Sequence, residues 1–330
     1  MKIIVTGGAG YIGSHTVVEL VKSGYDPIVL DNLSNTDIRN IDGINKITEK
    51  NIKFYNIDCT DSNAVKSVFE KENDILGLIH FAAFKSVEES VRLPEKYFRN
   101  NIGSLEVILD QMQQYNINNI IFSSSCTVYG SPDKLPVTEN FPFKKAESPY
   151  GETKQKCEDI LNNSSIKSIS LRYFNPIGSH SSSLIGDCSA DKPANLVPII
   201  CEAAIGKRDK LVINGNDYNT VDGTCIRDYI HVVDLAKSHV LALKYLLKNN
   251  CKEVFNIGTG KGLSVLDIIN NFEKANNIKL NYSFGKRRSG DIEKIYSDSS
   301  KAKEILKWSS KISIKETMID AWNWQLTRDN

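Results

Sequence analysis

A glycine-rich turn close to the start of the chain constrains the fold more than any other feature. The apolar run at residues 2–6 leads directly into Thr6-Gly7-Gly8-Ala9-Gly10-Tyr11-Ile12-Gly13, and a helical pattern follows over residues 12–22. Glycines at 7, 10 and 13 permit a tight turn and let backbone N–H groups approach a pyrophosphate, which the helix dipole also attracts. The pattern is typical of the first strand-turn-helix unit of a dinucleotide-binding sheet, although a plain structural turn can look the same.

The first half of the chain alternates short β-branched runs with amphipathic stretches. Strands are predicted at residues 2–6, 27–31, 52–58, 76–82, 119–124 and 166–173, and helices at 12–22, 62–71, 94–115 and 150–161. Such alternation requires a parallel sheet with right-handed crossovers. The fold class predicted is therefore α/β: a Rossmann-type doubly wound parallel sheet with a smaller C-terminal α/β substrate lobe.

The composition and the periodicity of the sequence change after Asn175. Residues 176–195 are rich in Pro, Gly, Ser and Asp and show no periodicity, which indicates a linker. We expect a nucleotide-binding domain over residues 1–175 and a substrate domain over 176–330. Helices are predicted at 232–247, 264–276 and 299–326, and the segment at about 232–258 is expected to rejoin the main sheet through a strand at 253–258.

Charge and composition exclude several function classes. The 41 Lys and Arg nearly balance the 40 Asp and Glu, so the chain has no electrostatic footprint for nucleic acid or an anionic membrane. No apolar run reaches the roughly 18 residues of a membrane span, and no signal peptide is expected. The seven cysteines are scattered without a Cys-x-x-Cys pair, which predicts no disulfide framework, no metal site and a cytoplasmic location.

Acidic residues at two strand ends refine the prediction. Asp31 closes the second predicted strand 18 residues after Gly13, where a dinucleotide-binding unit places an acid on the adenosine ribose. A carboxylate there accepts hydrogen bonds from the 2′-hydroxyl and repels a 2′-phosphate, so the cofactor is predicted to be NAD. Asp58 ends the third strand and is a weaker candidate for the adenine amino group.

Three further residues form a candidate catalytic set. Tyr150 and Lys154, in Ser148-Pro149-Tyr150-Gly151-Glu152-Thr153-Lys154, lie four apart and share one helix face. A nearby ammonium favours the phenolate, so Lys154 is expected to lower the Tyr150 pKa from its usual value of about 10. Ser125 ends a parallel strand in Phe122-Ser123-Ser124-Ser125-Cys126 and could bridge Tyr150 and a substrate hydroxyl.

Taken together, the motifs resemble those of the extended short-chain dehydrogenase/reductase family. The resemblance runs from Met1 to about Trp324, through VTGGAGYIGSHT, LDNLSN, IHFAAFKSVEES, FSSSCTVYG, SPYGETK, LRYFNPIGSH, GNDYNTVDGTCIRDYIHVVDL and RRSGD. It implies Ser125, Tyr150 and Lys154 as catalytic residues. It also implies an NAD site lined by Gly7, Gly10, Tyr11, Ile12, Gly13, Asp31, Asn32, Asp58, Cys59, Phe81, Ala82, Lys85, Asn100, Ser125, Tyr150, Lys154 and Phe174.

The resemblance further implies a nucleotide-sugar substrate, namely UDP-galactose and UDP-glucose. The matching positions are Lys85, Ser125, Tyr150, Asn175, Asn195, Leu196, Val212, Asn214, Arg227, Arg288, Asp291 and Ile295. Arg227 and Arg288 suit a clamp on two phosphates, because a planar cation can bind a diphosphate bidentately. The activity implied is epimerisation at C4 through hydride transfer to tightly bound NAD, rotation of the 4-keto sugar and return of the hydride, in a homodimer.

Alternatives remain within and outside this enzyme class. A nucleotide-sugar dehydratase or decarboxylase is disfavoured because Cys126 and Thr127 stand where those relatives carry an acid after the serine position, and elimination of water needs a general acid. A non-catalytic NAD-binding regulator is disfavoured by the intact catalytic set. The sequence departs from the family pattern at Asn214, where an aromatic usually packs on uracil, and at Ile295, where relatives carry Tyr or a small residue.

Overall fold

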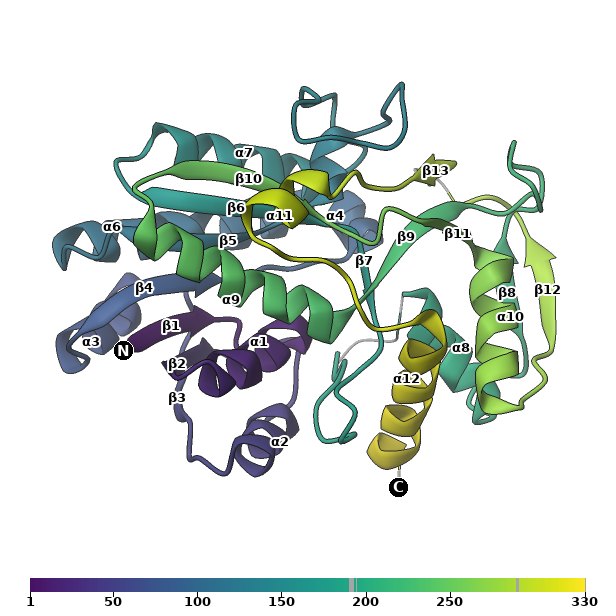
Figure 1. Cartoon of the computed structure of the whole chain (residues 1–330), viewed down its shortest axis with the longest axis horizontal. Helices are drawn as coiled ribbons and strands as arrows, with labels where there is room; N and C mark the ends of the chain where they lie inside the picture. The colour runs from purple at the N-terminus through teal and green to yellow at the C-terminus, as the bar shows by residue number, and fades with distance from the viewer. Residues whose placement is uncertain (190–192, 194, 289–290, 330) are drawn as a thin grey trace.

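The computed structural model describes residues 1–189, 193, 195–288 and 291–329 of the chain. Its centre is a seven-stranded sheet in which every neighbouring pair is parallel (Figure 1). The strand order is β10-β6-β5-β4-β1-β2-β3. The strands are β1 (Lys2–Thr6), β2 (Asp26–Asp31), β3 (Lys53–Asn56), β4 (Ile75–His80), β5 (Asn119–Ser125), β6 (Lys167–Tyr173) and β10 (Lys252–Ile257).

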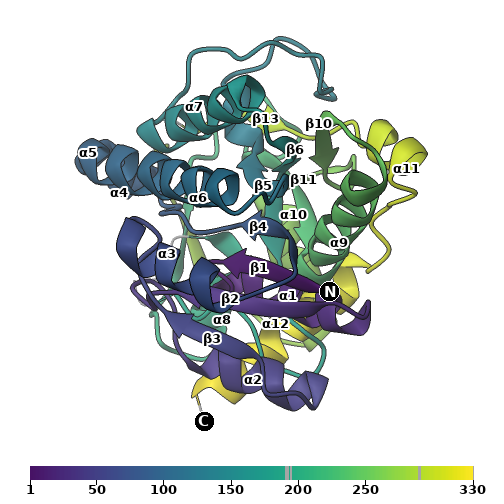
Figure 2. The ribbon, with the colours of Figure 1, turned by 90° about the vertical axis from the view of Figure 1, so that its left-hand side faces the viewer.

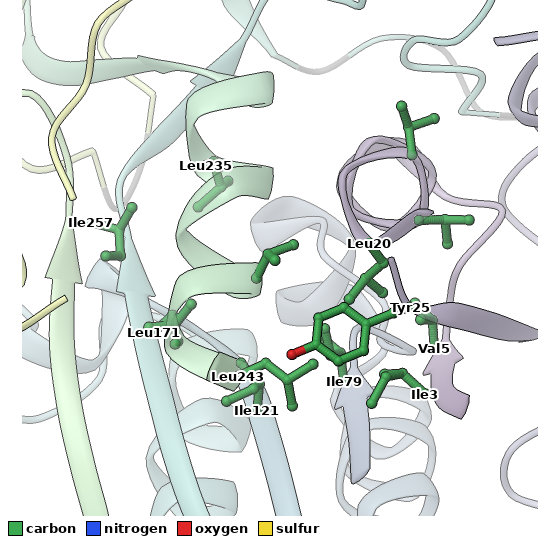
Figure 3. Packing of buried hydrophobic residues seen from close by; sticks show 14 of the residues in the cluster. Ile3, Val5, Leu20, Tyr25, Ile79, Ile121, Leu171, Leu235, Leu243 and Ile257 are labelled. Atoms are coloured by element: carbon green, nitrogen blue, oxygen red, sulfur yellow. The ribbon is translucent and has the colours of Figure 1, made fainter. Parts of the chain in front are cut away.

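Helices cover both faces of this sheet, as the end-on view shows (Figure 2). One face carries α1 (Tyr11–Lys22) and α9 (Val232–Lys248), whose apolar residues pack on strand residues such as Ile3, Val5 and Ile121 (Figure 3). The other face carries α3 (Ser62–Lys71), α6 (Gly103–Gln114) and α7 (Pro149–Asn163) over a second apolar cluster. The predicted Rossmann-type doubly wound sheet is therefore confirmed.

The remaining elements form two smaller sheets and a third apolar cluster. β9 (Ile226–His231) pairs with β7 (Asn175–Ile177), β11 (Gly262–Ser264) and β13 (Lys294–Ile295), while β8 (Leu211–Asn214) pairs with β12 (Tyr282–Gly285). The apolar cluster joins α8 (Leu196–Ala204), α10 (Val265–Asn276) and α12 (Ile314–Asp329). Within the described part of the chain, no helix has the length and apolar character needed to cross a membrane.

Several elements differ from the sequence-based prediction. Helices α2 (Arg39–Thr48) and α4 (Val87–Arg92) were not predicted, and the helix expected at 94–115 divides into α5 (Pro94–Tyr97), a π-helical turn (Phe98–Ile102) and α6. The helix expected at 299–326 is also broken, into α11 (Ser300–Ile305) and α12. Asp234 holds the segment between these two helices, because its carboxylate accepts hydrogen bonds from the backbone N–H groups of Lys311 and Ile312.

Candidate active site

A cavity of about 290 Å³ opens at the carboxyl ends of the parallel strands, where open α/β sheets bind their ligands. Every residue predicted for the NAD site lines it: Gly7, Gly10, Tyr11, Ile12, Gly13, Asp31, Asn32, Asp58, Cys59, Phe81, Ala82, Lys85, Asn100, Ser125, Tyr150, Lys154 and Phe174. The structure thus brings together motifs that lie more than 140 residues apart in the chain. Within the described residues, no group of three or more His, Cys, Asp or Glu side chains is arranged to hold a metal ion.

The glycine-rich turn forms a cradle that larger residues would fill. A Cβ atom on Gly13 would lie 2.2 Å from the carbonyl oxygen of Gly7, and Gly7 itself adopts a φ of +66°. Helix α1 begins directly after Gly10 without a side-chain cap and without an acidic residue in its first turn. Its terminal N–H groups and its dipole therefore favour an anion, so this turn fits the diphosphate of a dinucleotide.

Asp31 stands at the end of β2 beside this turn. Its carboxylate accepts hydrogen bonds from the backbone N–H groups of Ala9, at 3.1 Å, and Leu33, at 3.0 Å. Burial raises the pKa of Asp31, while these backbone donors oppose the rise. Two backbone bonds fix the carboxylate and leave it further acceptor capacity for ribose hydroxyls.

The predicted catalytic residues converge at the opposite end of the cavity. Ser148 caps the start of α7, which carries Tyr150 and Lys154, while Ser125 ends β5. The Lys154 ammonium donates a hydrogen bond to the carbonyl of Ser123 at 2.7 Å and lies 5.8 Å from the centroid of the Tyr150 ring. Burial lowers the pKa of Lys154 to about 8.

Burial dominates the pKa of Tyr150 in this structure, and the predicted lowering of that pKa by Lys154 stays a prediction. Burial raises the pKa of Tyr150 above its usual value, the neighbouring Tyr173 adds to the rise, and only the hydrogen bond with Ser125 opposes it. The physical reason is that desolvation penalises the phenolate. Lys154 is itself buried and directs its ammonium to the backbone of β5.

Two of the sugar-site candidates, Asn175 and Asn195, also line the cavity. Lys85 lies there as well and forms an ion pair with Asp187, with 3.5 Å between Nζ and Oδ2. Although burial works against its ionised form, Lys85 and Ser189 hold the pKa of Asp187 below its usual value. Asp187 was not predicted as a site residue, because it lies in a segment without periodicity.

The two arginines predicted to bind the diphosphate, Arg227 and Arg288, are not among the residues that line this cavity. Arg288 contacts the Asp291 carboxylate at 2.7 Å, and Arg227 lies 3.7 Å from the same oxygen. Arg227 also donates to the carbonyl of Ile226, the residue before it. The two guanidinium groups therefore lie beside the same carboxylate oxygen of Asp291, and their binding of a diphosphate stays a prediction.

Other predicted substrate residues have different surroundings. Leu196 begins α8 and packs against the third apolar cluster, whereas Val212 and Asn214 are exposed on β8. Ile295 is 3% exposed and pairs with Arg227 across β13 and β9. Ile295 packs in a cluster with Cys126 and Phe174, which do line the cavity. Ile295 therefore supports lining residues from behind and is not itself among them.

The parallel sheet, the glycine cradle and the Ser125, Tyr150 and Lys154 set together define the site of a dinucleotide-dependent dehydrogenase/reductase. A model of the GDP-mannose 4,6 dehydratase family matches residues 4–321. A UDP-glucose 4-epimerase of Bacillus subtilis is 46% identical over 100% of this chain and 98% of its own length, and one of Dictyostelium discoideum is 45% identical over 100% and 97%.

Solved structures agree with these sequence relatives. The UDP-glucose 4-epimerase of Bifidobacterium longum, in complex with NAD+ and UDP, is 41% identical with a TM-score of 0.95 over 100% of this chain and 99% of that one. The Brucella ovis enzyme, in complex with NAD, is 36% identical with a TM-score of 0.89 over 97% of each chain. The chain belongs to the UDP-glucose 4-epimerase family, within the extended short-chain dehydrogenases/reductases.

Proposed function

We propose that this chain interconverts UDP-galactose and UDP-glucose with NAD as its cofactor. The observation that carries this proposal is the single cavity that joins the glycine cradle and Asp31 to Ser125, Tyr150 and Lys154. When bound, NAD would accept a hydride from C4 of the sugar and return it. The residues of the cavity would therefore have to leave the 4-keto sugar free to turn over between the two transfers.

The side chains of this cavity are assigned to holding the cofactor and moving one proton. Tyr150, directly or through Ser125, takes the proton from the sugar 4-hydroxyl and later returns it, and Lys154 supplies a buried positive charge beside it. Asp31 holds the adenosine ribose and selects NAD over NADP. Because burial raises the Tyr150 pKa, positive charge from Lys154 and from the nicotinamide is needed for the phenolate to form.

Residues 176–330 are proposed to bind the UDP moiety firmly while leaving the sugar free to turn. Arg227 and Arg288 would bind the diphosphate, and Asn175 and Asn195 would contact the sugar nucleotide. A dehydratase reaction is less compatible with this site, because Cys126 and Thr127 follow Ser125 where a general acid would be needed. Burial raises the pKa of the Cys126 thiol to about 12, which makes it a very weak acid.

We also propose a cytoplasmic homodimer. All seven cysteines are free, which suits a reducing compartment. The outer faces of the helical segment 94–115 and of α7 are proposed as the contact, since a groove of about 590 Å³ is lined partly by Ile102 of the π-helical turn and Ile160 of α7. Sedimentation of the wild type and of Ile160→Asp tests this contact, because an unchanged dimer in the variant would place it elsewhere.

The decisive experiment is a single incubation. Pure protein is given UDP-galactose without added NAD, and the sugar products are identified. UDP-glucose is the expected product, whereas a 4-keto-6-deoxy sugar or no turnover would contradict the proposal. Denaturing the same preparation releases the bound nucleotide, which is expected to be NAD; NADP as the main species would overturn the role of Asp31.

A further inference from the structure

The segment at residues 184–188, here called the strap, passes beside the glycine-rich turn. It lies between α2 and α12, which Figure 1 shows on either side of the loop that follows β7. Ile185 is fully buried, and a Cβ atom on Gly186 would lie 2.5 Å from the Trp324 ring of α12. Asp187 lines the cavity and forms an ion pair with Lys85, which also lines it. The strap therefore closes one wall of the cavity next to the turn.

One buried side chain joins the strap to the turn. Asn40 of α2 is 0% exposed, and its amide nitrogen donates to the carbonyl of Ala9 at 2.9 Å and to that of Gly186 at 3.1 Å. Its amide oxygen accepts the backbone N–H of Gly186 at 3.2 Å and the thiol of Cys188 at 3.6 Å. A single amide thus satisfies both backbone groups of Gly186 and holds a carbonyl of the turn.

The same helix makes room for the strap one turn further on. A Cβ atom on Gly43 would lie 2.1 Å from the carbonyl oxygen of Leu184 and 2.6 Å from the Ile185 side chain. A larger residue at position 43 would therefore push the strap away from α2. Asn40 and Gly43 lie three residues apart and so share one face of the helix.

We infer that Asn40 is a positioning residue that retains NAD in its site, by fixing the strap against the glycine-rich turn. This inference rests on the proposed function, because it concerns the cofactor of the same cavity. Asn40 does not line the cavity and acts through its neighbours. When the Asn40 amide is lost, the buried N–H and carbonyl of Gly186 lose their hydrogen-bond partners. The closed position of the strap is then destabilised relative to a position in which water can bind these groups. The Asp187–Lys85 pair would then open, and the dinucleotide could escape.

The test compares Asn40→Ala with Asn45→Ala, a matched change on the same helix. Asn45 accepts the backbone N–H of Ile52 at 2.9 Å, whereas the bonds to the strap and to the turn come from Asn40. Each purified holoenzyme is mixed with excess isotope-labelled NAD, and the exchange of the bound nucleotide is followed by mass spectrometry. NAD content per chain and the thermal midpoint are recorded for every variant.

We expect Asn40→Ala to exchange NAD about tenfold faster or more, as a hydrogen-bonded closure is weakened, and Asn45→Ala to exchange it at the wild-type rate. Gly43→Ala provides a second perturbation, since alanine favours the helix itself and yet displaces the strap. If Asn40→Ala does not fold, the rate of NAD exchange in Gly43→Ala tests the inference in its place. Wild-type exchange in the variants that fold, or equal acceleration in Asn45→Ala, would overturn the inference. A wild type that holds no NAD would instead contradict the proposed function.

Discussion

At the scale of single residues, Tyr150 shows how burial and catalysis oppose one another. Its ring is 8% exposed, and burial raises its pKa although an ammonium lies nearby. The sequence shows the helical spacing of Tyr150 and Lys154, but the surroundings of the phenol also depend on Tyr97, Tyr173 and the segment Ser125-Cys126, which are distant in the chain. Local spacing could therefore predict the pair, but it could not predict the direction of the pKa shift.

Replacing Tyr150 with Phe tests the proton transfer. The ring remains and the hydroxyl is lost, so turnover of UDP-galactose should fall about 10²–10⁴-fold, the usual contribution of general acid–base catalysis. NAD content should not change. Tyr173→Phe is the matched control, because Tyr173 also lines the cavity but hydrogen-bonds Ser123 at 2.6 Å. Near-normal turnover in Tyr150→Phe would exclude this residue as the base.

Ile295 is expected to limit the size of the sugar from behind the cavity wall. Ile295→Ser removes bulk behind Cys126 and Phe174 and should raise the kcat/KM for UDP-N-acetylgalactosamine relative to UDP-galactose, whereas Ile295→Tyr overpacks the cluster and should lower it. Wild type is predicted to prefer UDP-galactose markedly. Ile292→Ser, from the same cluster, is the control. The same ratio of the two kcat/KM values in every form would show that position 295 does not control sugar size.

At the scale of elements, the pairing of β9 with β13 sets the surroundings of Arg227. The register places Ile295 opposite Arg227, and Arg288 contacts the Asp291 carboxylate at 2.7 Å. This pairing joins segments about 70 residues apart, so the sequence could suggest the clamp only by resemblance. The roles of both arginines remain predictions.

Arg227→Ala and Arg288→Ala should each weaken UDP binding roughly 10–100-fold, since a hydrogen bond to a charged group contributes about 1.5–3 kcal/mol. Calorimetric titration with UDP measures this, and NAD content should stay constant. Arg287→Ala is the matched control, because its guanidinium pairs with Asp217 at 2.7 Å and lies over the Tyr218 ring. If all three variants bind UDP like the wild type, the clamp does not exist.

The strands of the main sheet were predictable because their apolar runs are short and bounded by turn residues, and the predicted fold class is confirmed. Helix boundaries were less predictable where tertiary contacts decide them. The segment between α11 and α12 is held by the Asp234 carboxylate, which lies about 77 residues away in the chain and accepts the backbone N–H groups of Lys311 and Ile312. Helix α2 was missed although it carries Asn40 and Gly43, because its short apolar face contains only Ile41, Ile44 and Ile47. The boundary proposed at residue 175 stays a prediction.

At the scale of the whole molecule, three buried histidines make stability depend on pH. Burial lowers the pKa of His15 and His80 to about 3 and that of His239 to about 4. In each, Nδ1 has a hydrogen-bond partner, while the buried Nε2 has none among the residues that the structure describes. Because the unfolded chain titrates near 6.5, it binds more protons than the native state below that pH.

The free energy of unfolding should therefore fall as the pH drops from about 6.5 toward 4, by about 2 kcal/mol per histidine at pH 5. Urea denaturation at pH 8, 6.5 and 5 measures the loss. His239→Leu should reduce the slope against pH by close to one proton, whatever its effect on stability at pH 8. A stability that is flat between pH 6.5 and 5 would show that these imidazoles are accessible to protons in the native state.

The position of β10 has a consequence for how the chain is made. This edge strand of the main sheet comes from Lys252–Ile257, and α9, which covers one face, comes just before it. A ribosome that has released only the first 175 residues therefore presents an open β6 edge and an uncovered apolar face. Unpaired strand edges invite association with other chains. Synthesis of this enzyme should accordingly depend on chaperones until about residue 257 has emerged.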